Sequence, residues 1–583
     1  MRSPSFRGRP FRGRPFRIFD ALHMTTSIMP VSSASRRLPR LRFNLWSAGA
    51  LIIALAVAAP IFTVLGLAFT DTSDIWTHLY KTVLGLYLKR TITLMFGVGI
   101  GTLVIGTGTA WLVTMCRFPG SRIFEWALLL PLAVPAYVLA FVVTDQLEYA
   151  GTVQSTLRDM FGWTRPQDYW FPEIRSMGGA IVVMTLVLYP YVYLLARSAF
   201  LEQSVCVLEV SRTLGKTAWG SFTRIALPLA RPAIVVGVTL VLMEVINDFG
   251  TVDYFAVQTF TAGIFDVWLN MNSVGGAAQL SSVLLLVVLV LIVTERMARR
   301  DRKFHHTSNK YSELPSYRLR GYKATLSFFA CALPVLLGFI FPASVLSHYA
   351  LSFYEETLSA DFFSYVINSL TLSASAALLA VVVGLFLAYA VRLSEGPWIK
   401  IAARIASIGY AVPGAILAVG VLWPTGALDQ SLSWISGNFG IAVGGVMIGT
   451  IVPIVYGYLV RFLALAYGTS EASLGKITPN MDGAARTLGS NPSQTLKRVH
   501  FPLMRGSLMT AAILVFVDCM KELPLTIILR PFNFDTLATF VYQYASDELL
   551  EESALGALTI VGAGIIPVIL LSVTIAKSRP GKL

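Results

Sequence analysis

Residues 209–215 read Glu-Val-Ser-Arg-Thr-Leu-Gly, and after nine more residues positions 225–228 read Ile-Ala-Leu-Pro. A near copy lies 274 residues later, where residues 483–489 read Gly-Ala-Ala-Arg-Thr-Leu-Gly and positions 499–502 read Val-His-Phe-Pro. Each polar stretch lies between apolar segments long enough to cross a bilayer as a helix. The sequence therefore predicts a duplicated membrane protein with two equivalent polar loops.

The composition of the whole chain agrees with a membrane location. Of its 583 residues, 55% are hydrophobic and only 13% are charged, whereas soluble domains carry about 25% charged residues. The apolar surplus must face lipid, and in lipid every backbone amide needs an internal partner, which helices provide. We therefore predict an all-α polytopic membrane protein.

The net charge of +14 is concentrated at the N-terminus, where residues 1–43 hold ten arginines and one acid, Asp20. This Arg/Pro/Gly-rich segment cannot bury a core, and we predict a disordered basic tail. Such a tail suits the anionic cytoplasmic face of a membrane, so we expect contact with lipid and not with nucleic acid. The four cysteines are scattered and match no metal or redox spacing.

We predict about 12 transmembrane helices in two tandem six-helix domains, 44–300 and 323–583, joined by a basic cytoplasmic linker, 301–322. The predicted spans of the first domain are 44–70, 91–115, 124–146, 178–200, 230–251 and 279–297. Those of the second domain are 324–346, 366–392, 402–424, 440–462, 505–527 and 555–576. The two polar loops occupy residues 203–228 and 477–502.

Loop charges predict the orientation. Basic residues dominate the loops that we place inside, and acids dominate those that we place outside. Lys89 and Arg90 are an exception, because they fall outside in this orientation. Both termini and both polar loops are therefore predicted to be cytoplasmic. The halves also match between the loops, for example Ala133-Val134-Pro135 with Ala411-Val412-Pro413, 278 residues apart. Six spans in each half predict a pseudo-twofold axis along the membrane normal, with a translocation path on it.

Each polar loop has features of a short helix on the membrane surface. Residues 203–214 suit an amphipathic helix, Gly215 can supply the left-handed turn that ends it, and Pro228 is expected to break the chain before the next span. A basic loop that only enforces topology is the alternative, but two loops with the same spacing argue against it. Gly215-Lys216-Thr217 imitates the end of a P-loop, yet Val210 stands where its first glycine is needed. We expect no cofactor and no ATP binding by this chain.

The loop pattern resembles the EAA loop of permease subunits in bacterial binding-protein-dependent ABC importers. That resemblance implies a coupling helix seated in a groove of a cytoplasmic ATPase, present in two copies, and a periplasmic solute-binding protein in a bacterial cell inner membrane. The coupling residues that it implies are Glu209, Gly215, Leu227 and Pro228, with Gly489 and Pro502 in the second copy. There, Gly483 stands in the place of the glutamate and Asp482 lies one position earlier, so whether Asp482 takes the glutamate's role stays open.

Within that class, a double-length chain resembles the ferric-iron permeases, and so does the segment from Glu244 to Phe255. The candidate path residues are Glu244, Asn247 and Asp248, with Asp518, Lys521 and Glu522 at the matching place of the second half. Ionisable groups inside a bilayer normally face a cavity or a partner. One interpretation is a path for a hard trivalent cation, with no fixed metal site. The other is that Lys521 pairs with these acids and holds the two halves in register.

Other solutes of related permeases, namely thiamine, aminoethylphosphonate and polyamines, remain alternatives to ferric iron. A secondary transporter with two parallel six-helix halves would also explain the duplication and the acidic residues. Neither it nor an ion channel predicts two matched coupling loops.

Overall fold

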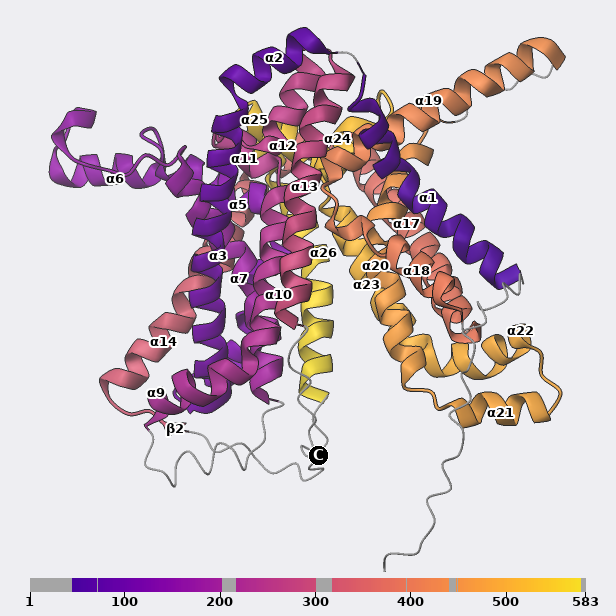
Figure 1. Ribbon diagram of the computed structural model, residues 1–583. Helices are drawn as coiled ribbons and strands as arrows, with labels where there is room; N and C mark the ends of the chain where they lie inside the picture. Colours follow the sequence, from indigo (N-terminus) through magenta and orange to yellow (C-terminus); the bar gives the residue numbers. More distant parts are fainter. Residues whose placement is uncertain are drawn as a thin grey trace, which may run out of the picture. The chain divides into compact units, whose positions relative to one another are not determined.

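The computed structural model describes residues 45–70, 72–201, 217–299, 317–394, 396–439, 447 and 449–577. The chain divides into the units Met1–Phe43 and Asn44–Leu583, and the described residues of the second are mostly helical (Figure 1). The predicted tail, 1–43, lies outside the described residues. Among those described, strand structure is limited to the parallel pair β1 (Cys116–Arg117) and β2 (Tyr317–Arg318).

The described residues contain 11 helices long and apolar enough to cross a membrane, or 12 if one bent pair counts as a span, which confirms the predicted all-α polytopic fold. The long helices of the first half are α1 (Leu45–Leu67), α3 (Leu84–Met115), α7 (Met177–Leu201), α10 (Leu227–Asn247) and α13 (Val274–Arg299). Those of the second half are α14 (Tyr322–Val335), which continues through η5 (Leu336–Ile340) into α15 (Phe341–Ser352), α17 (Ala360–Leu393), α19 (Gly414–Phe439), α20 (Val452–Gly475), α23 (Phe501–Met520) and α26 (Leu550–Lys577).

Short elements connect these helices. Those of the first half are α2 (Ser73–Thr82), α4 (Ser121–Ala127), η1 (Leu130–Ala133), α5 (Ala136–Leu147), α6 (Thr152–Phe161), η2 (Pro166–Asp168), α9 (Ala218–Ser221), η3 (Phe222–Ala226), α11 (Gly250–Tyr254), α12 (Phe260–Phe265) and η4 (Asp266–Asn270). Those of the second half are α16 (Tyr354–Thr357), α18 (Pro397–Ala406), η6 (Gly409–Ala411), α21 (Pro479–Thr487), α22 (Pro492–Thr495), η7 (Leu496–His500), α24 (Pro524–Leu529) and α25 (Leu537–Ser546).

Two predicted spans, 124–146 and 402–424, are wrong as single helices. The first is bent by 89° between Ser121–Ala133 and Ala136–Phe161. Val134 is extended there (φ −89°, ψ 121°), and Val412 is extended in the same way (φ −86°, ψ 124°) between η6 and α19. Both residues precede a proline, which disfavours helical backbone at the preceding position.

Two further spans end earlier than predicted, and both ends matter for the site. The span predicted at 230–251 ends at Asn247, and the span predicted at 505–527 ends at Met520. Each is followed by a short helix, α11 or α24, after a break of two or three residues. The span predicted at 440–462 is described only in part, because residues 440–446 lie outside the described residues, and its helix α20 begins at Val452.

Each half has a core of three packed helices, α3, α7 and α10 in the first and α17, α20 and α23 in the second. A glycine lies at the closest approach in each core. A Cβ on Gly106 would lie 2.9 Å from the Tyr189 carbonyl oxygen, and one on Gly384 would lie 2.9 Å from the Tyr467 amide nitrogen. Small residues let membrane helices approach closely, so these matched glycines hold equivalent helix pairs together.

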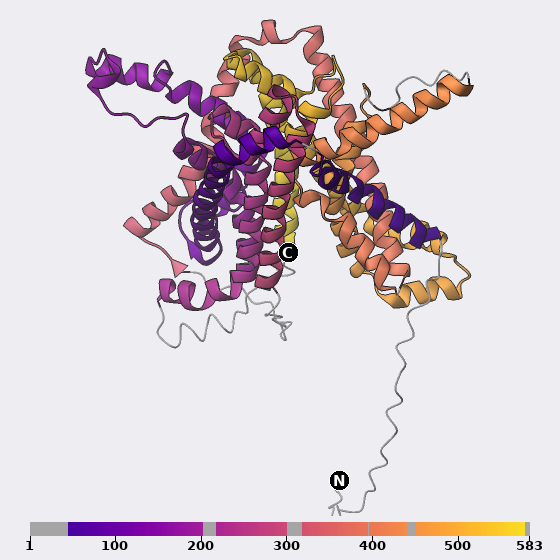
Figure 2. The ribbon, with the colours of Figure 1, turned by 45° about the horizontal axis from the view of Figure 1, so that its top comes forward.

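The first helix of each half crosses to the other half. Helix α1 packs against α17, α18 and α19, and it lies beside the orange helices in both Figure 1 and Figure 2. Helix α14 packs against α3 and α4, and η5 packs against α7 and η1. The predicted domain boundaries stay a prediction, but the two halves interlock through these crossing helices.

Candidate translocation cavity and coupling helices

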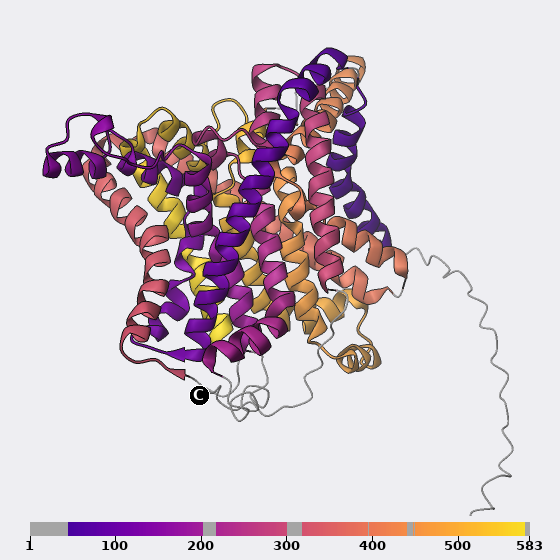
Figure 3. The same ribbon diagram turned by 60° about the vertical axis from the view of Figure 1, so that its left-hand side comes forward.

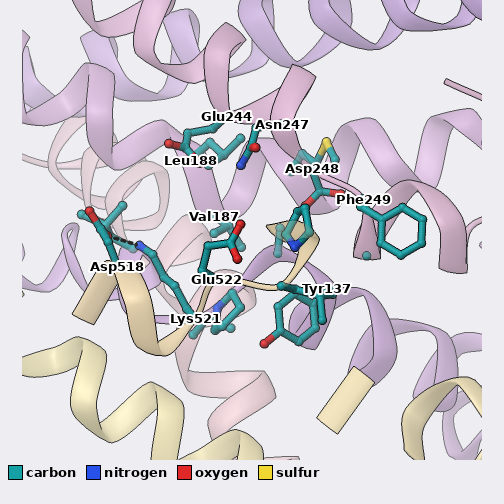
Figure 4. Close-up of a pocket in the computed structure, with 18 of the residues that line it drawn as sticks. Tyr137, Val187, Leu188, Glu244, Asn247, Asp248, Phe249, Asp518, Lys521 and Glu522 are labelled. Atoms are coloured by element: carbon teal, nitrogen blue, oxygen red, sulfur yellow. Dashed lines mark ion pairs between the residues drawn. The ribbon is translucent and has the colours of Figure 1, made fainter. Parts of the chain in front are cut away.

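A cavity lies where the two halves meet, and all six predicted path residues line it (Figure 4). They come from the C-terminal ends of α10 and α23 and from the breaks that follow. Side chains on α5, α7, η6 and α20 complete the lining, among them Tyr137, Tyr191, Tyr410 and Arg461. The sequence therefore identified residues that converge on one cavity, while their part in transport stays a prediction.

The six residues form three pairs, each separated by 274 positions. Glu244 corresponds to Asp518, Asn247 to Lys521, and Asp248 to Glu522. Both triplets lie at a point where a spanning helix stops and a short helix begins. The pairs therefore present equivalent positions of the two halves to one cavity.

Asp248 and Glu522 both cap the short helix that follows them. The Thr251 amide donates to Asp248 Oδ1 (2.9 Å), and the Thr526 amide donates to Glu522 Oε2 (3.1 Å). Threonine hydroxyls donate to the same two carboxylates, at 3.0 Å in each case. Such bonds satisfy amides that the first turn of a helix leaves unpaired. These two acids thus have a structural role at the breaks.

Arg461, which sequence reasoning missed, is the buried cation of the cavity, with 6% of its surface exposed. Its Nη1 lies 3.1 Å from Glu522 Oε1 and donates to Asn247 Oδ1 at 2.8 Å. Asn247 Oδ1 also accepts from the Gly414 amide at 2.7 Å. These bonds join α10 to the second half. An arginine inside an apolar span was the available sequence signal.

Lys521 does not take part in the bonds that Arg461 and Asn247 form across the two halves. Its ammonium lies 3.0 Å from Asp518 Oδ1, three residues earlier in the chain. Figure 4 shows this pair at the end of α23. Lys521 therefore has its ion pair within its own half, whereas Arg461 and Asn247 bond to each other across the two halves.

Glu244, like Asp518, makes a single polar contact among the described residues. The Tyr410 hydroxyl donates to its Oε1 at 3.2 Å, and among the described residues Glu244 has no ion pair. Two buried polar atoms of the lining, Tyr137 Oη and Arg461 Nε, have no hydrogen-bond partner in the same part of the chain. No three His, Cys, Asp or Glu side chains among the described residues converge closely enough to hold a metal ion. Among the described residues, the cavity thus offers hydrogen-bond acceptors and an unbonded tyrosine hydroxyl, but no group of three side chains placed to hold a metal ion.

The second polar loop lies with α9 at one end of the helices (Figures 1 and 3). Helix α21 ends in a left-handed turn at Gly489, whose φ is +80°. A side chain at such a backbone angle is strained, which explains the glycine. Gly489 thus has the conformation predicted for Gly215, while Glu209 and Gly215 themselves lie outside the described residues.

The expected chain break at Pro228 is wrong. Elements α9, η3 and α10 form one continuous helix from Trp219 to Asn247, with Pro228 as the second residue of α10. A wide π-turn precedes the proline, in which the Leu227 amide donates to the Phe222 carbonyl. The same arrangement, η7, precedes Pro502. The wider turn provides room where proline cannot donate to the helix, so each loop is joined rigidly to a span.

Asp482 fastens α21 to the rest of the second half. Its Oδ2 accepts from Arg392 Nε (2.9 Å), and its Oδ1 lies 2.7 Å from His500 Nε2. Partial burial raises the pKa of Asp482, but the bonds to Arg392 and His500 outweigh it and hold that pKa below its ordinary value. At the corresponding positions of the first half, Thr114 and Ala226 replace Arg392 and His500. The two partners of Asp482 in this cluster therefore have no equivalent in the sequence of the first half.

Residues 102–303 match the family described as "binding-protein-dependent transport system inner membrane component". The chain is 27% identical over 500 residues to the Fe(3+)-transport system permease protein FbpB 2 of Haemophilus influenzae, covering 85% of this chain and 90% of that relative. It is 24% identical to the ferric transport system permease protein FbpB of Actinobacillus pleuropneumoniae, covering 79% and 67%. The molybdenum transport system permease protein ModB of Escherichia coli is 28% identical over 209 residues, 35% of this chain and 88% of its own length. Such single-length relatives match only part of the chain, as expected for a double-length permease.

Proposed function

Since the chain is a double-length permease subunit of the binding-protein-dependent ABC importer family, we propose that it passes ferric iron from a periplasmic binding protein to the cytoplasm. The observation that carries this proposal is the charge of the cavity. Four carboxylates and two basic side chains line it, which leaves a formal charge of −2. A hard trivalent cation favours carboxylate oxygen, whereas an oxyanion such as molybdate or sulfate would be repelled by that charge.

The energy for transport comes from a partner, because this chain carries no P-loop. Two copies of a cytoplasmic ATPase bind the two polar loops, and both termini lie on that side of the membrane. Helix α21 suits this contact because, of its nine residues, Ala485 alone is buried. Leu488, just beyond it, is 85% exposed. Closure of the ATPase dimer moves α21 and its counterpart, and the continuous helices beyond η3 and η7 transmit that movement to the cavity.

The solute is tested by uptake of radioactive iron in a strain that lacks other iron routes. We expect the double variant Glu244→Gln/Asp518→Asn to reduce uptake at least tenfold, a loss of about 1.4 kcal/mol or more. The matched control is Glu355→Gln/Asp361→Asn, two exposed acids outside the cavity, which should leave uptake unchanged. Normal iron uptake in the cavity variant, together with lost thiamine uptake, would refute ferric iron as the cargo.

Docking of the ATPase is tested by co-purification. Replacing both Gly215 and Gly489 by valine should abolish it, since the turn at Gly489 requires a positive φ (+80°). The control is Gly562→Val, at an exposed glycine of α26 with open space around it. Retained co-purification of the double variant would contradict the assignment of the loops.

A further inference from the structure

Lys521 occupies an unusual place in the cavity. Its ammonium bonds to Asp518 (3.0 Å), and Glu244 lines the same cavity. These two acids are the matched pair at equivalent positions of the two halves. The equivalent of Lys521 in the first half is the neutral Asn247. Lys521, from one half, therefore lines the cavity together with an acidic pair that both halves contribute.

We propose that Lys521 takes the place of the cargo in the empty permease: its ammonium offsets one of the two negative charges of the Glu244–Asp518 pair, and an arriving trivalent cation displaces it. The inference rests on the proposed transport of ferric iron. Buried acids are costly without a counter-charge, so an empty cavity needs its own cation. At equal distance a trivalent ion attracts each carboxylate three times as strongly as an ammonium does. The exchange therefore favours highly charged ions over monovalent ones.

The two basic side chains of the cavity differ in their freedom to move. Arg461 is held by Glu522 and Asn247, and 7% of its side chain is exposed. The Lys521 side chain is 25% exposed and has one ion pair among the described residues. A lysine ammonium on its four-carbon stem can withdraw from a site that a cation enters. Lys521 is thus the exchangeable cation and Arg461 the fixed one.

A second feature of the lining indicates a ligand independently of the acids. Tyr137 is 4% exposed, lines the cavity and has no hydrogen-bond partner for its hydroxyl among the described residues. Figure 4 shows it across the cavity from Asp518. A buried hydroxyl without a partner is unfavourable, and its oxygen is a ligand that an entering hard cation can bind. The cavity therefore contains an oxygen donor that nothing in the described chain uses.

The test measures binding of terbium(III), a hard trivalent probe whose luminescence the cavity tyrosines sensitise, to the purified full-length permease in nanodiscs. We expect Lys521→Met to bind terbium at least tenfold more tightly than the unmodified protein, because the competing ammonium is gone. Lys521→Arg, which keeps the charge, should retain the original affinity. Lys81→Met, at an exposed lysine on α2, is the matched control and should change nothing.

Glu244→Gln added to Lys521→Met should return the affinity toward that of the unmodified protein. If Lys521→Met does not yield folded protein, Lys521→Gln replaces it, since the amide can still bond to Asp518. Equal or weaker terbium binding by the folded variant would overturn the exchange, even with normal iron uptake. Tighter binding without any iron uptake by the unmodified protein would instead overturn the proposed solute and support the exchange.

Discussion

The two triplets that line the cavity have the same backbone and different charges. In both, a spanning helix stops and an acid, Asp248 or Glu522, caps the short helix beyond the break. The residue just before each acid differs between the halves: it is Asn247 in the first half and Lys521 in the second. The position that holds Arg461 in the second half holds Val187 in the first, and both line the cavity. Positions that the halves share maintain the break, whereas positions that differ determine the charge.

Because the basic side chains all come from the second half, the net negative charge of the cavity comes from the first half. The second half contributes two acids and both basic side chains, so its formal charge is zero. The first half contributes Glu244 and Asp248 without a basic residue, and therefore carries the whole formal charge of −2. A cation that enters the cavity is drawn toward the end of α10.

The largest expected loss of stability follows from breaking the buried ion pair between Arg461 and Glu522, because the first half has no basic residue at the position of Arg461. Arg461→Met should destabilise the protein by about 3–5 kcal/mol, because it leaves Glu522 buried without its partner. Val187→Met, the matched change in the first half, should cost less than about 1.5 kcal/mol. Unfolding of the purified protein in detergent by heat or denaturant measures both. Similar stabilities of the two variants would contradict the assigned asymmetry.

A second test concerns positions where the halves agree. Gly106→Ala and Gly384→Ala each place a Cβ within 3.0 Å of backbone or Cβ atoms on the facing helix. Each should destabilise the protein by about 1–3 kcal/mol through overpacking. We expect the two losses, measured by the same unfolding experiment, to agree within about 1 kcal/mol. A large difference would show that the two helix cores are not equivalent.

Much of this arrangement could be predicted from the sequence. Composition predicted the helical membrane fold, and the internal match at 274 positions located all six path residues. The predicted spans 124–146 and 402–424 run through Pro135 and Pro413, although a residue before proline avoids helical backbone. A chain break is predicted at Pro228, but a π-turn lets the helix continue past this residue. Arg461 was missed because its partners, Glu522 and Asn247, are 61 and 214 residues away.

Two substitutions of Asp248 distinguish its helix-capping bonds from its charge, and we expect a smaller loss of stability from them. Asp248→Ala removes the bonds to the first turn of α11 and should cost about 0.5–2 kcal/mol. Asp248→Asn can still cap the helix, so its stability should lie close to that of the unmodified protein. Unfolding measurements on both variants distinguish them. Equal losses for Ala and Asn would indicate that Asp248 acts through its charge and not through its capping bonds.

The smallest expected effect concerns the cluster that fastens α21 and that the first half lacks. Asp482→Asn should weaken the docking of α21 by about 1 kcal/mol, measured as faster hydrogen exchange of the α21 amides after correction for intrinsic rates. The bonds to Arg392 and His500 hold the pKa of Asp482 below its ordinary value.

The contribution of Asp482 to docking is therefore fully present above its unfolded pKa, about 3.9, and is lost as the pH falls through the lower folded value. Asp482 stays ionised between pH 8 and pH 5, so Asp482→Asn should remain destabilising throughout that range, and the difference from the unmodified protein should vanish only below about pH 4. A difference that disappeared between pH 8 and pH 5 would mean that this carboxylate does not hold α21.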